Sequence, residues 1–271
     1  MFNQNSMPRQ GNILDKIVDR KWLEIEAAKA EIAVSELEKS EYFPRACFSM
    51  RDFILDENRK GIIAEFKRAS PSKGIINDHS TVQEVTQAYN HAGASALSVL
   101  TDVHFFSGQP ADLVEARKVN EIPILRKDFM LDEYQILEAK AWGADIVLLI
   151  ASILTPIQVQ TMARFAKSLN MNVLLEVHNL EELKRSLCEE LDAIGVNNRN
   201  LGTFEVNLDH SYKLLSEIPD QFLKISESGL SKPETVIDLK KAGFNGFLIG
   251  ENFMKEQDPG RAMEEFVEQI R

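Results

Sequence analysis

The sequence is poor in cysteine and has no long apolar run. Its two cysteines, Cys47 and Cys188, show neither a disulfide framework nor a metal-ligand spacing, which is the usage expected in a reducing cytoplasm. No stretch approaches the roughly 20 apolar residues needed to cross a bilayer, and residues 1–12 are polar, without the apolar core of a signal peptide. We therefore expect a cytoplasmic protein with no membrane partner.

Histidine and positive charge are also scarce. The five histidines are scattered and form no HExxH or other two-ligand pattern, so no metal site is expected. Acidic residues number 42 against 31 basic ones, for a formal net charge of -11. A nucleic-acid backbone would be repelled by most of such a surface. Any phosphate that binds should be small and held at a local site.

The first 60 residues differ from the rest of the chain. Residues 1–12 are expected to be disordered, whereas residues 13–39 carry apolar side chains at three- and four-residue steps, which predicts one or two amphipathic helices. Residues 42–60 read as a linker followed by a short helix around 49–57. Residues 13–60 are therefore predicted to form an N-terminal helical extension.

After Lys60 the chain alternates short β-branched runs with charged helical stretches in units of about 20 to 35 residues. The predicted strands lie in residues 61–67, 96–101, 122–129, 145–152, 172–178, 192–199, 222–229 and 246–253. The predicted helices between them lie in residues 81–93, 111–119, 132–143, 155–169, 179–190, 208–218 and 232–243. Eight such units without a composition break predict an α/β fold, a (β/α)8 TIM barrel over residues 61–271, with residues 13–271 forming one structural domain.

Charged and amide side chains follow the apolar part of most predicted strands. In "GIIAEFKRASPSKG" the alternation of a strand places Glu65 and Lys67 on one face, opposite Ile62, Ala64 and Phe66. The same reasoning turns seven side chains toward the barrel mouth, namely Glu65, Lys67, Lys127, Glu176, Asn197, Arg199 and Glu227. An internal salt-bridge network is the structural alternative, but burying several charged pairs is rarely the cheapest route to stability, so we expect a polar ligand.

The loops after the seventh and eighth strands suggest a phosphate site. They supply Ser228, Gly229, Gly250 and Glu251, and in many barrels the backbone N–H groups of these loops bind phosphate. The turn after the first strand adds Ser70 and Ser72, with Lys67 close enough in sequence to neutralise charge.

These motifs together resemble one family. The segments "IIAEFKRASPSKG", "IPILRKDFMLDEYQI", "LLEVHN", "IGVNNRNL", "ISESG" and "FLIGENFM" are similar to those of indole-3-glycerol phosphate synthase, from about Ile13 to Met254. The resemblance implies a carbon–carbon lyase of tryptophan biosynthesis that needs no cofactor or metal. Its substrate would be a phosphorylated anthranilate derivative, 1-(2-carboxyphenylamino)-1-deoxyribulose 5-phosphate, which loses carbon dioxide and water as the indole ring closes.

The resemblance also implies residue roles. Lys127 is the expected acid of ring closure, and Lys67 and Glu176 are the expected acid and base of dehydration, with the order of the lysines open. Glu65 and Asn197 would support them. The expected substrate-binding residues are Arg199, Glu227, Ser98, Phe106 and Phe129. The phosphate would lie on Ser70, Ser228, Gly229, Gly250 and the backbone N–H of Glu251.

Three other functions are alternatives to this one. Phosphoribosylanthranilate isomerase relies on a cysteine and an aspartate at strand ends, whereas Cys47 precedes the first strand and Cys188 is expected in a helix. A Schiff-base aldolase would use Lys127 as a nucleophile. A non-catalytic scaffold would be expected to have lost the acids, and all are present. The acidic surface and N-terminal helix could support association with another enzyme of the pathway, but the residues identify no partner.

Overall fold

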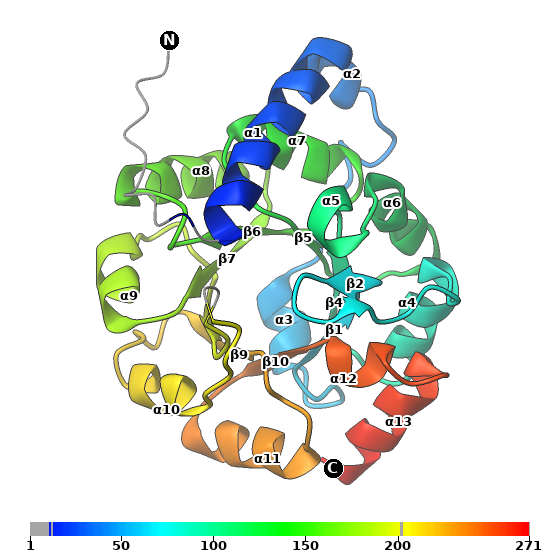
Figure 1. The fold of residues 1–271 in the computed structure, drawn as a ribbon, viewed down its shortest axis with the longest axis vertical. Coiled ribbons are helices and arrows are strands. Elements are labelled where there is room, and N and C mark those ends of the chain that lie inside the picture. The colour runs from blue at the N-terminus through cyan, green and yellow to red at the C-terminus, as the bar shows by residue number, and fades with distance from the viewer. Residues whose placement is uncertain (1–10, 12, 201–202, 271) are drawn as a thin grey trace.

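The computed structural model describes residues 11, 13–200 and 203–270, and in it eight parallel strands close into a barrel (Figure 1). The order around the barrel is β1-β10-β9-β8-β7-β6-β5-β4. The strands are β1 (Ile62–Phe66), β4 (Ala96–Leu100), β5 (Ile124–Lys127), β6 (Ile146–Ile150), β7 (Asn172–Val177), β8 (Ala193–Asn197), β9 (Leu223–Glu227) and β10 (Gly246–Ile249). All eight predicted strands are present, and the predicted TIM barrel is confirmed.

A ring of helices surrounds the strands (Figure 1). It consists of α4 (Val82–His91), α6 (Pro110–Val119), α7 (Glu133–Ala141), α8 (Pro156–Ser168), α9 (Leu180–Ser186), α10 (Asp209–Leu215), α11 (Pro233–Ala242) and α13 (Pro259–Gln269). Several starts are set by local sequence: the Thr81 hydroxyl accepts from the Glu84 N–H while the Glu84 side chain accepts from Thr81, the reciprocal pattern of a capping box.

The structure departs from the sequence prediction in several short elements and in the C-terminal helix. Helix α9 ends at Ser186 rather than near residue 190, so Cys188 lies after the helix and not within it. Helix α13 was not predicted, nor were the one-turn helices α5 (Val103–Phe106) and α12 (Glu251–Met254). The small antiparallel pair β2 (Ala69–Ser70) and β3 (Gly74–Ile75) was also missed. One-turn elements carry too few residues for a periodic pattern.

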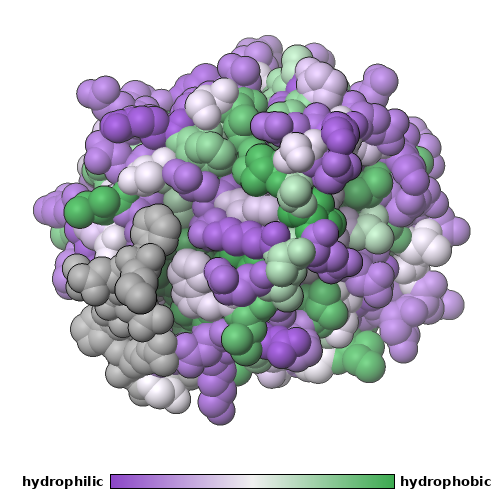
Figure 2. Space-filling view, turned by 90° about the horizontal axis from the view of Figure 1, so that it is seen from above, coloured by the Kyte–Doolittle hydropathy of each residue, from purple (hydrophilic) through white to green (hydrophobic). Residues whose placement is uncertain are grey.

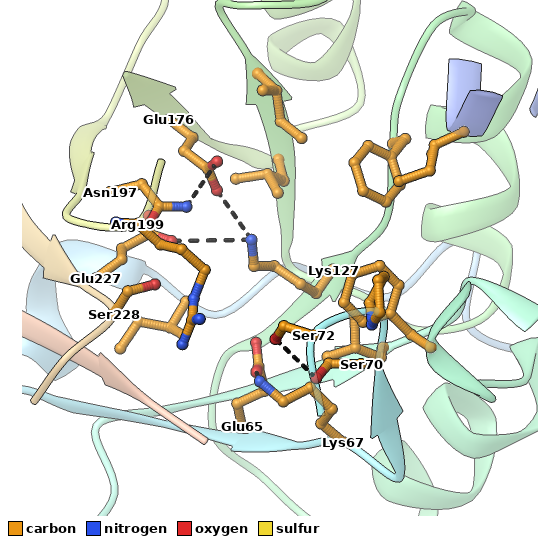
Figure 3. A pocket seen from close by; sticks show the side chains of 18 of the residues that line it. Glu65, Lys67, Ser70, Ser72, Lys127, Glu176, Asn197, Arg199, Glu227 and Ser228 are labelled. Atoms are coloured by element: carbon orange, nitrogen blue, oxygen red, sulfur yellow. Dashed lines mark hydrogen bonds and ion pairs between the residues drawn. The ribbon is translucent and has the colours of Figure 1, made fainter. Parts of the chain in front are cut away.

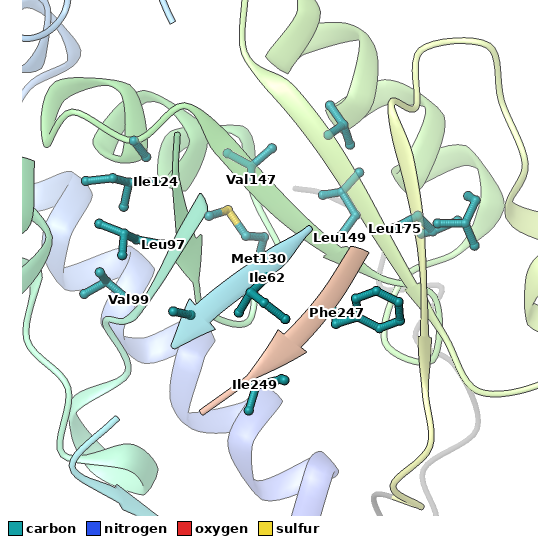
Figure 4. Close-up of a cluster of buried hydrophobic side chains, with 14 of the residues drawn as sticks. Ile62, Leu97, Val99, Ile124, Met130, Val147, Leu149, Leu175, Phe247 and Ile249 are labelled. Atoms are coloured by element: carbon teal, nitrogen blue, oxygen red, sulfur yellow. The ribbon is translucent and has the colours of Figure 1, made fainter. Parts of the chain in front are cut away.

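The barrel has two apolar layers, one between the strands and the helix ring and one inside the barrel. Alternate strand residues pack outward against the helices, among them Ile62, Leu97, Val147 and Phe247 (Figure 4). The residues next to these in sequence, such as Ile63, Leu125, Leu174 and Ile225, fill the interior. This is the alternation expected of a barrel strand.

The N-terminal extension contacts both ends of the barrel. Helix α1 (Ile13–Glu31) is followed by the short helices α2 (Val34–Leu37) and α3 (Met50–Leu55). Met50 and Ile54 of α3 pack with the interior residues Ile63 and Leu125, so α3 closes the barrel where the strands begin. Helix α1 lies at the opposite end (Figure 1).

The boundary between extension and barrel, and the single-domain assignment, remain predictions. The expected disorder of residues 1–12 falls, apart from Gly11, outside the described residues.

Hydrophilic residues predominate on the face in Figure 2, with hydrophobic ones in small groups between them. Among the described residues, no helix is both long enough and apolar enough to span a bilayer.

Candidate active site

A cavity of about 140 Å³ lies where the strands end. It is lined from nearly every strand end and from α1 by Ile13, Leu14, Ile17, Glu65, Lys67, Ser70, Pro71, Ser72, Leu100, Phe106, Lys127, Asp128, Phe129, Leu148, Ile150, Glu176, Asn197, Arg199, Phe204, Glu227, Ser228, Leu248 and Glu251. Every predicted catalytic residue is in this set. Glu65 and Lys67 of "AEFKRAS" therefore line a cavity and are not enclosed in the core.

In several strands the inward-facing row changes from apolar to polar along its length. In β7 Leu174 packs in the interior and Glu176 reaches the cavity, and in β5 Leu125 precedes Lys127 in the same way. In strand β9 Ile225 packs in the interior and Glu227 lines the cavity in the same way. The apolar half of each row anchors the strand, and the last inward residue is left to carry the polar group.

Lys127 lies at the centre of the polar cluster (Figure 3). Its Nζ is 2.9 Å from Glu176 Oε2 and 3.8 Å from Glu227 Oε2. Asn197 Nδ2 donates to Glu176 Oε1 at 3.0 Å, so the two oxygens of Glu176 have different partners. This arrangement holds the Glu176 carboxylate in one orientation, with Lys127 on one side.

Across the cavity Lys67 Nζ is 2.8 Å from Glu65 Oε1 (Figure 3). Ser98 Oγ donates to Glu65 Oε2 at 3.3 Å. Ser98, predicted to bind substrate, is fully buried and is not among the lining residues. Its contact in the structure is with Glu65. We therefore replace the direct-binding role of Ser98 with support of the Glu65 carboxylate.

Burial and neighbouring charges have opposite effects on the pKa values of several ionisable groups in the cluster. Burial disfavours the charged form of Lys127, but Glu176, Glu227 and Glu65 outweigh it and raise the pKa of the lysine. Burial works against the anionic form of Glu176 as well, yet Lys127 and His178 lower its pKa. For Glu227 burial and the charge of Glu176 prevail over Lys127, so its pKa is raised. These shifts favour a cationic Lys127, an ionised Glu176 and a neutral Glu227.

A glycine that the sequence reasoning overlooked makes room for Glu227. A Cβ added at Gly195 in β8 would lie 2.1 Å from Glu227 Oε1. The backbone of Gly195 does not have a positive φ, so the requirement is for space and not for an unusual conformation. The signal was present in "IGVNN", where glycine interrupts an apolar strand, a place where close approach is common.

The predicted phosphate-binding residues surround the rim of the cavity. Ser70, Ser228 and Glu251 line it, whereas Gly229 and Gly250 do not. Ser228 and Gly229 both have left-handed backbones, with φ of 69° and 78°, which sharply turns the chain after β9. A Cβ at Gly250 would lie 2.6 Å from Glu65 Oε1, so this glycine gives room to a cluster carboxylate.

Arg199 lines the cavity at the barrel mouth, toward which strand alternation directed it. It lies at the rim, where its guanidinium is 3.5 Å from Glu251, and Lys73 Nζ is 3.7 Å from the same carboxylate. The charges converging in the centre are therefore two lysines, Lys67 and Lys127, and three carboxylates, with Arg199 outside them.

Apolar groups form the remaining wall. Phe106 and Phe129 lie with ring centroids 6.0 Å apart, and both line the cavity, as predicted for an aromatic pocket. Helix α1 adds Ile13, Leu14 and Ile17, a contribution that the sequence could not decide.

Helix α1 is fixed at this end by Lys21. Its Nζ is 2.8 Å from Asp102 and 2.9 Å from Asp128, the residue after Lys127. The buried bridge ties the extension to the strand that carries the central lysine.

A (β/α)8 barrel with converging lysines and carboxylates at its mouth belongs to the class of barrel enzymes that act on small polar substrates. The model of the family described as indole-3-glycerol phosphate synthase matches residues 14–266. The chain belongs to this family, whose members are carboxy-lyases of tryptophan biosynthesis.

Individual relatives agree with the family model. The chain is 44% identical over 260 residues to an indole-3-glycerol phosphate synthase of Bacteroides thetaiotaomicron, covering 96% of this chain and 99% of that protein. It is 44% identical over 262 residues to one of Acidovorax sp., covering 93% of this chain and 97% of that protein.

Solved structures show the fold alone. A 3-hexulose-6-phosphate synthase of Salmonella typhimurium superposes with a TM-score of 0.60 at 14% identity, covering 78% of this chain and 100% of that one. A tryptophan synthase alpha-subunit mutant of Pyrococcus furiosus gives a TM-score of 0.60 at 16% identity, covering 79% and 98%.

Proposed function

We propose that the residues lining the cavity at the barrel mouth catalyse closure of the indole ring, with Lys127 as the acid of that step. Family membership gives the chain its reaction, the conversion of 1-(2-carboxyphenylamino)-1-deoxyribulose 5-phosphate to indole-3-glycerol phosphate with loss of carbon dioxide and water. The observation that carries the assignment is the position of the Lys127 ammonium, between Glu176 and Glu227 in a partly apolar cavity.

Ring closure needs an acid. The ring carbon that bears the carboxylate attacks the substrate carbonyl, whose oxygen becomes a hydroxyl and must receive a proton. The raised pKa of Lys127 keeps it protonated and able to donate. The same shift argues against a Schiff-base role, because an attacking amine must be neutral and is usually activated by a lowered pKa.

Loss of the hydroxyl needs a second acid and a base. Lys67 and Glu176 take these roles in our proposal, since Lys67 faces Lys127 across the cavity and the lowered pKa of Glu176 leaves its carboxylate free to accept a proton. Asn197 and Glu65 hold the base and Lys67 in place. Glu227 contacts Lys127 and positions it.

The substrate phosphate would lie at the rim. Ser70, Ser228, Gly229, Gly250 and the backbone N–H of Glu251 are the proposed ligands, with Lys67 neutralising charge nearby. The Glu251 carboxylate would repel phosphate by itself, but it is flanked by Arg199 and Lys73, which offset its charge.

The anthranilate ring would pack against Phe106 and Phe129, whose rings together form one apolar wall. Arg199 is the proposed partner of the substrate carboxylate. Its guanidinium suits this role because the planar group can donate two parallel hydrogen bonds to one carboxylate.

The test is the appearance of indole fluorescence when the purified protein meets the carboxyphenylamino-deoxyribulose phosphate. Lys127→Ala should lower kcat by about 100-fold or more, the usual contribution of a positioned acid. Lys118→Ala, an exposed lysine that pairs with Glu115 on α6, is the matched control and should leave kcat unchanged. Survival of full activity in Lys127→Ala would move the acid role to Lys67, and an inactive wild type would refute the proposal.

A further inference from the structure

His178 extends the inward-facing row of β7 by one more position beyond Glu176. Its imidazole lies between two carboxylates, with Nε2 3.5 Å from Glu176 Oε1 and Nδ1 3.2 Å from Glu182 Oε2. Its side chain is only 13% exposed, and His178 is not among the residues lining the cavity. The histidine therefore lies behind the proposed base, on the side away from the substrate.

Glu182 holds the ring in this orientation. It belongs to the first turn of α9, and its Oε2 accepts the backbone N–H of His178 at 2.8 Å as well as facing Nδ1. Asn179 Nδ2 donates to the other oxygen at 3.0 Å. The Nε2 atom of His178 is buried and has no hydrogen-bond partner. The ring is thus fixed at one nitrogen, and the other is directed at Glu176.

The neighbouring charges favour a protonated imidazole. Burial opposes the cation, but Glu182, Glu176 and Glu227, on α9, β7 and β9, together raise the pKa of His178 above its ordinary value. Lys127 on β5 lies on the far side of Glu176, 2.9 Å from its other oxygen. The order of groups is therefore carboxylate, imidazole, carboxylate, ammonium, from α9 to the centre of the site.

The reaction needs a proton from outside. Two protons are donated, one to the carbonyl oxygen and one to the departing hydroxyl, whereas the base recovers only one from the carbon beside the ring nitrogen. Carbon dioxide leaves as a neutral molecule from a carboxylate, so each turnover consumes one proton. Lys127 gives up its proton in ring closure, before Glu176 has taken one from the substrate, so a positioned group that returns a proton to Lys127 at this point would prepare the site for the next step.

We propose that Glu182, His178 and Glu176 form a proton relay that returns a proton to Lys127 after ring closure, with His178 as a positioning residue that never touches substrate. In this step the Nε2–H bond of His178 breaks and an O–H bond forms on Glu176, and the carboxyl proton then passes to the neutral amine of Lys127, which leaves Glu176 ionised. The proton that Glu176 next takes from the substrate carbon returns to Nε2 of His178, and Lys67, which lines the cavity, regains its proton from solvent; this is the one proton consumed per turnover. This inference rests on the proposed function.

The experiment compares His178→Gln, Glu182→Gln and the wild type by indole fluorescence between pH 6 and 9. His178→Gln keeps size and a hydrogen-bond donor but cannot pass a proton. Its kcat should fall about tenfold or more, with KM changed less than about threefold, and the decline of wild-type kcat at high pH should disappear. His178→Ala should regain activity on addition of imidazole. His79→Gln, at a histidine with a 57% exposed side chain on the surface, is the matched control.

Glu182→Gln provides a second test, through the pH dependence of kcat. Removing this charge lowers the pKa of His178, so the fall of kcat at high pH should move to lower pH while the fold is retained. An unchanged kcat and pH profile in both variants, or a loss in His178→Ala that imidazole does not restore, would overturn the relay. An inactive wild type would overturn the proposed function itself, so the two failures are distinguishable.

Discussion

Gly195→Ala tests whether the position of Glu227 matters to the reaction. The new methyl group would lie 2.1 Å from Glu227 Oε1, 3.1 Å from its Cδ and 3.3 Å from Leu174 Cδ1. Ordinary contact begins at 3.4 Å, so the carboxylate must retreat by about 1.3 Å. The movement is directed at a group that already faces Lys127 at 3.8 Å.

The expected result is a large loss of activity with a small change in stability. A misplacement of about 1 Å costs roughly 100-fold in rate, so kcat should fall by about that factor. The strand backbone accepts alanine, which gains about 0.5–1 kcal/mol over glycine inside a strand and offsets part of the clash. Steady-state kinetics and urea unfolding measure the two effects separately.

A double variant makes this test specific. Glu227→Ala removes the carboxylate that the new methyl group would strike, so adding Gly195→Ala to it should cost nothing further in kcat or in unfolding free energy. Wild-type kcat in Gly195→Ala alone would refute the claim that the Glu227 position matters. Equal additional losses in both backgrounds would show that the methyl group acts elsewhere.

Three further predictions concern buried charges. Lys21→Met leaves Asp102 without the cation of Lys21 and Asp128 with Arg126 alone, and should lower the free energy of unfolding by about 3 kcal/mol in urea titration, with a higher KM because α1 lines the cavity. Burial alone would raise the pKa of Asp128, but Lys21 and Arg126 lower it to about 2, below its unfolded value; its stabilisation, about 2 kcal/mol, is full above pH 4 and should be lost as the pH falls toward 2. Glu227→Gln removes a carboxyl whose ionisation the fold disfavours, and should raise the unfolding free energy at pH 8 by about 0.5–2 kcal/mol while lowering kcat.

The sequence predicted the elements and strand ends well because both follow from local periodicity. Eight strands and the side-chain alternation of "GIIAEFK" needed only neighbouring residues. The reach of Arg199 to Glu251 could not be predicted in the same way, because a side chain after the strand end is no longer constrained by alternation. The bridge from Lys21 to Asp102 and Asp128 joins segments about 80 to 110 residues apart, and no local pattern reveals such a contact.

His178 shows how a signal can be present and still be missed. It follows Glu176 by two residues in "LLEVHN" and so shares its face, by the rule that was applied to Glu65 and Lys67. A lone histidine at a strand end forms no two-ligand metal pattern, so its spacing marks it only through the neighbouring carboxylate. Its partner Glu182 lies four residues on, in the first turn of α9.

The charges at the barrel mouth are better explained by catalysis than by a salt-bridge network. A network selected for stability would satisfy its own members, yet Glu227 Oε1 is buried without a hydrogen-bond partner. The central cluster holds three carboxylates against two lysines, and the excess is relieved by a raised pKa at Glu227, which favours its neutral form. Such a site keeps a proton and an unsatisfied oxygen next to Lys127. Both are costs to folding, and both are useful to a reaction in which protons must be given and recovered in turn.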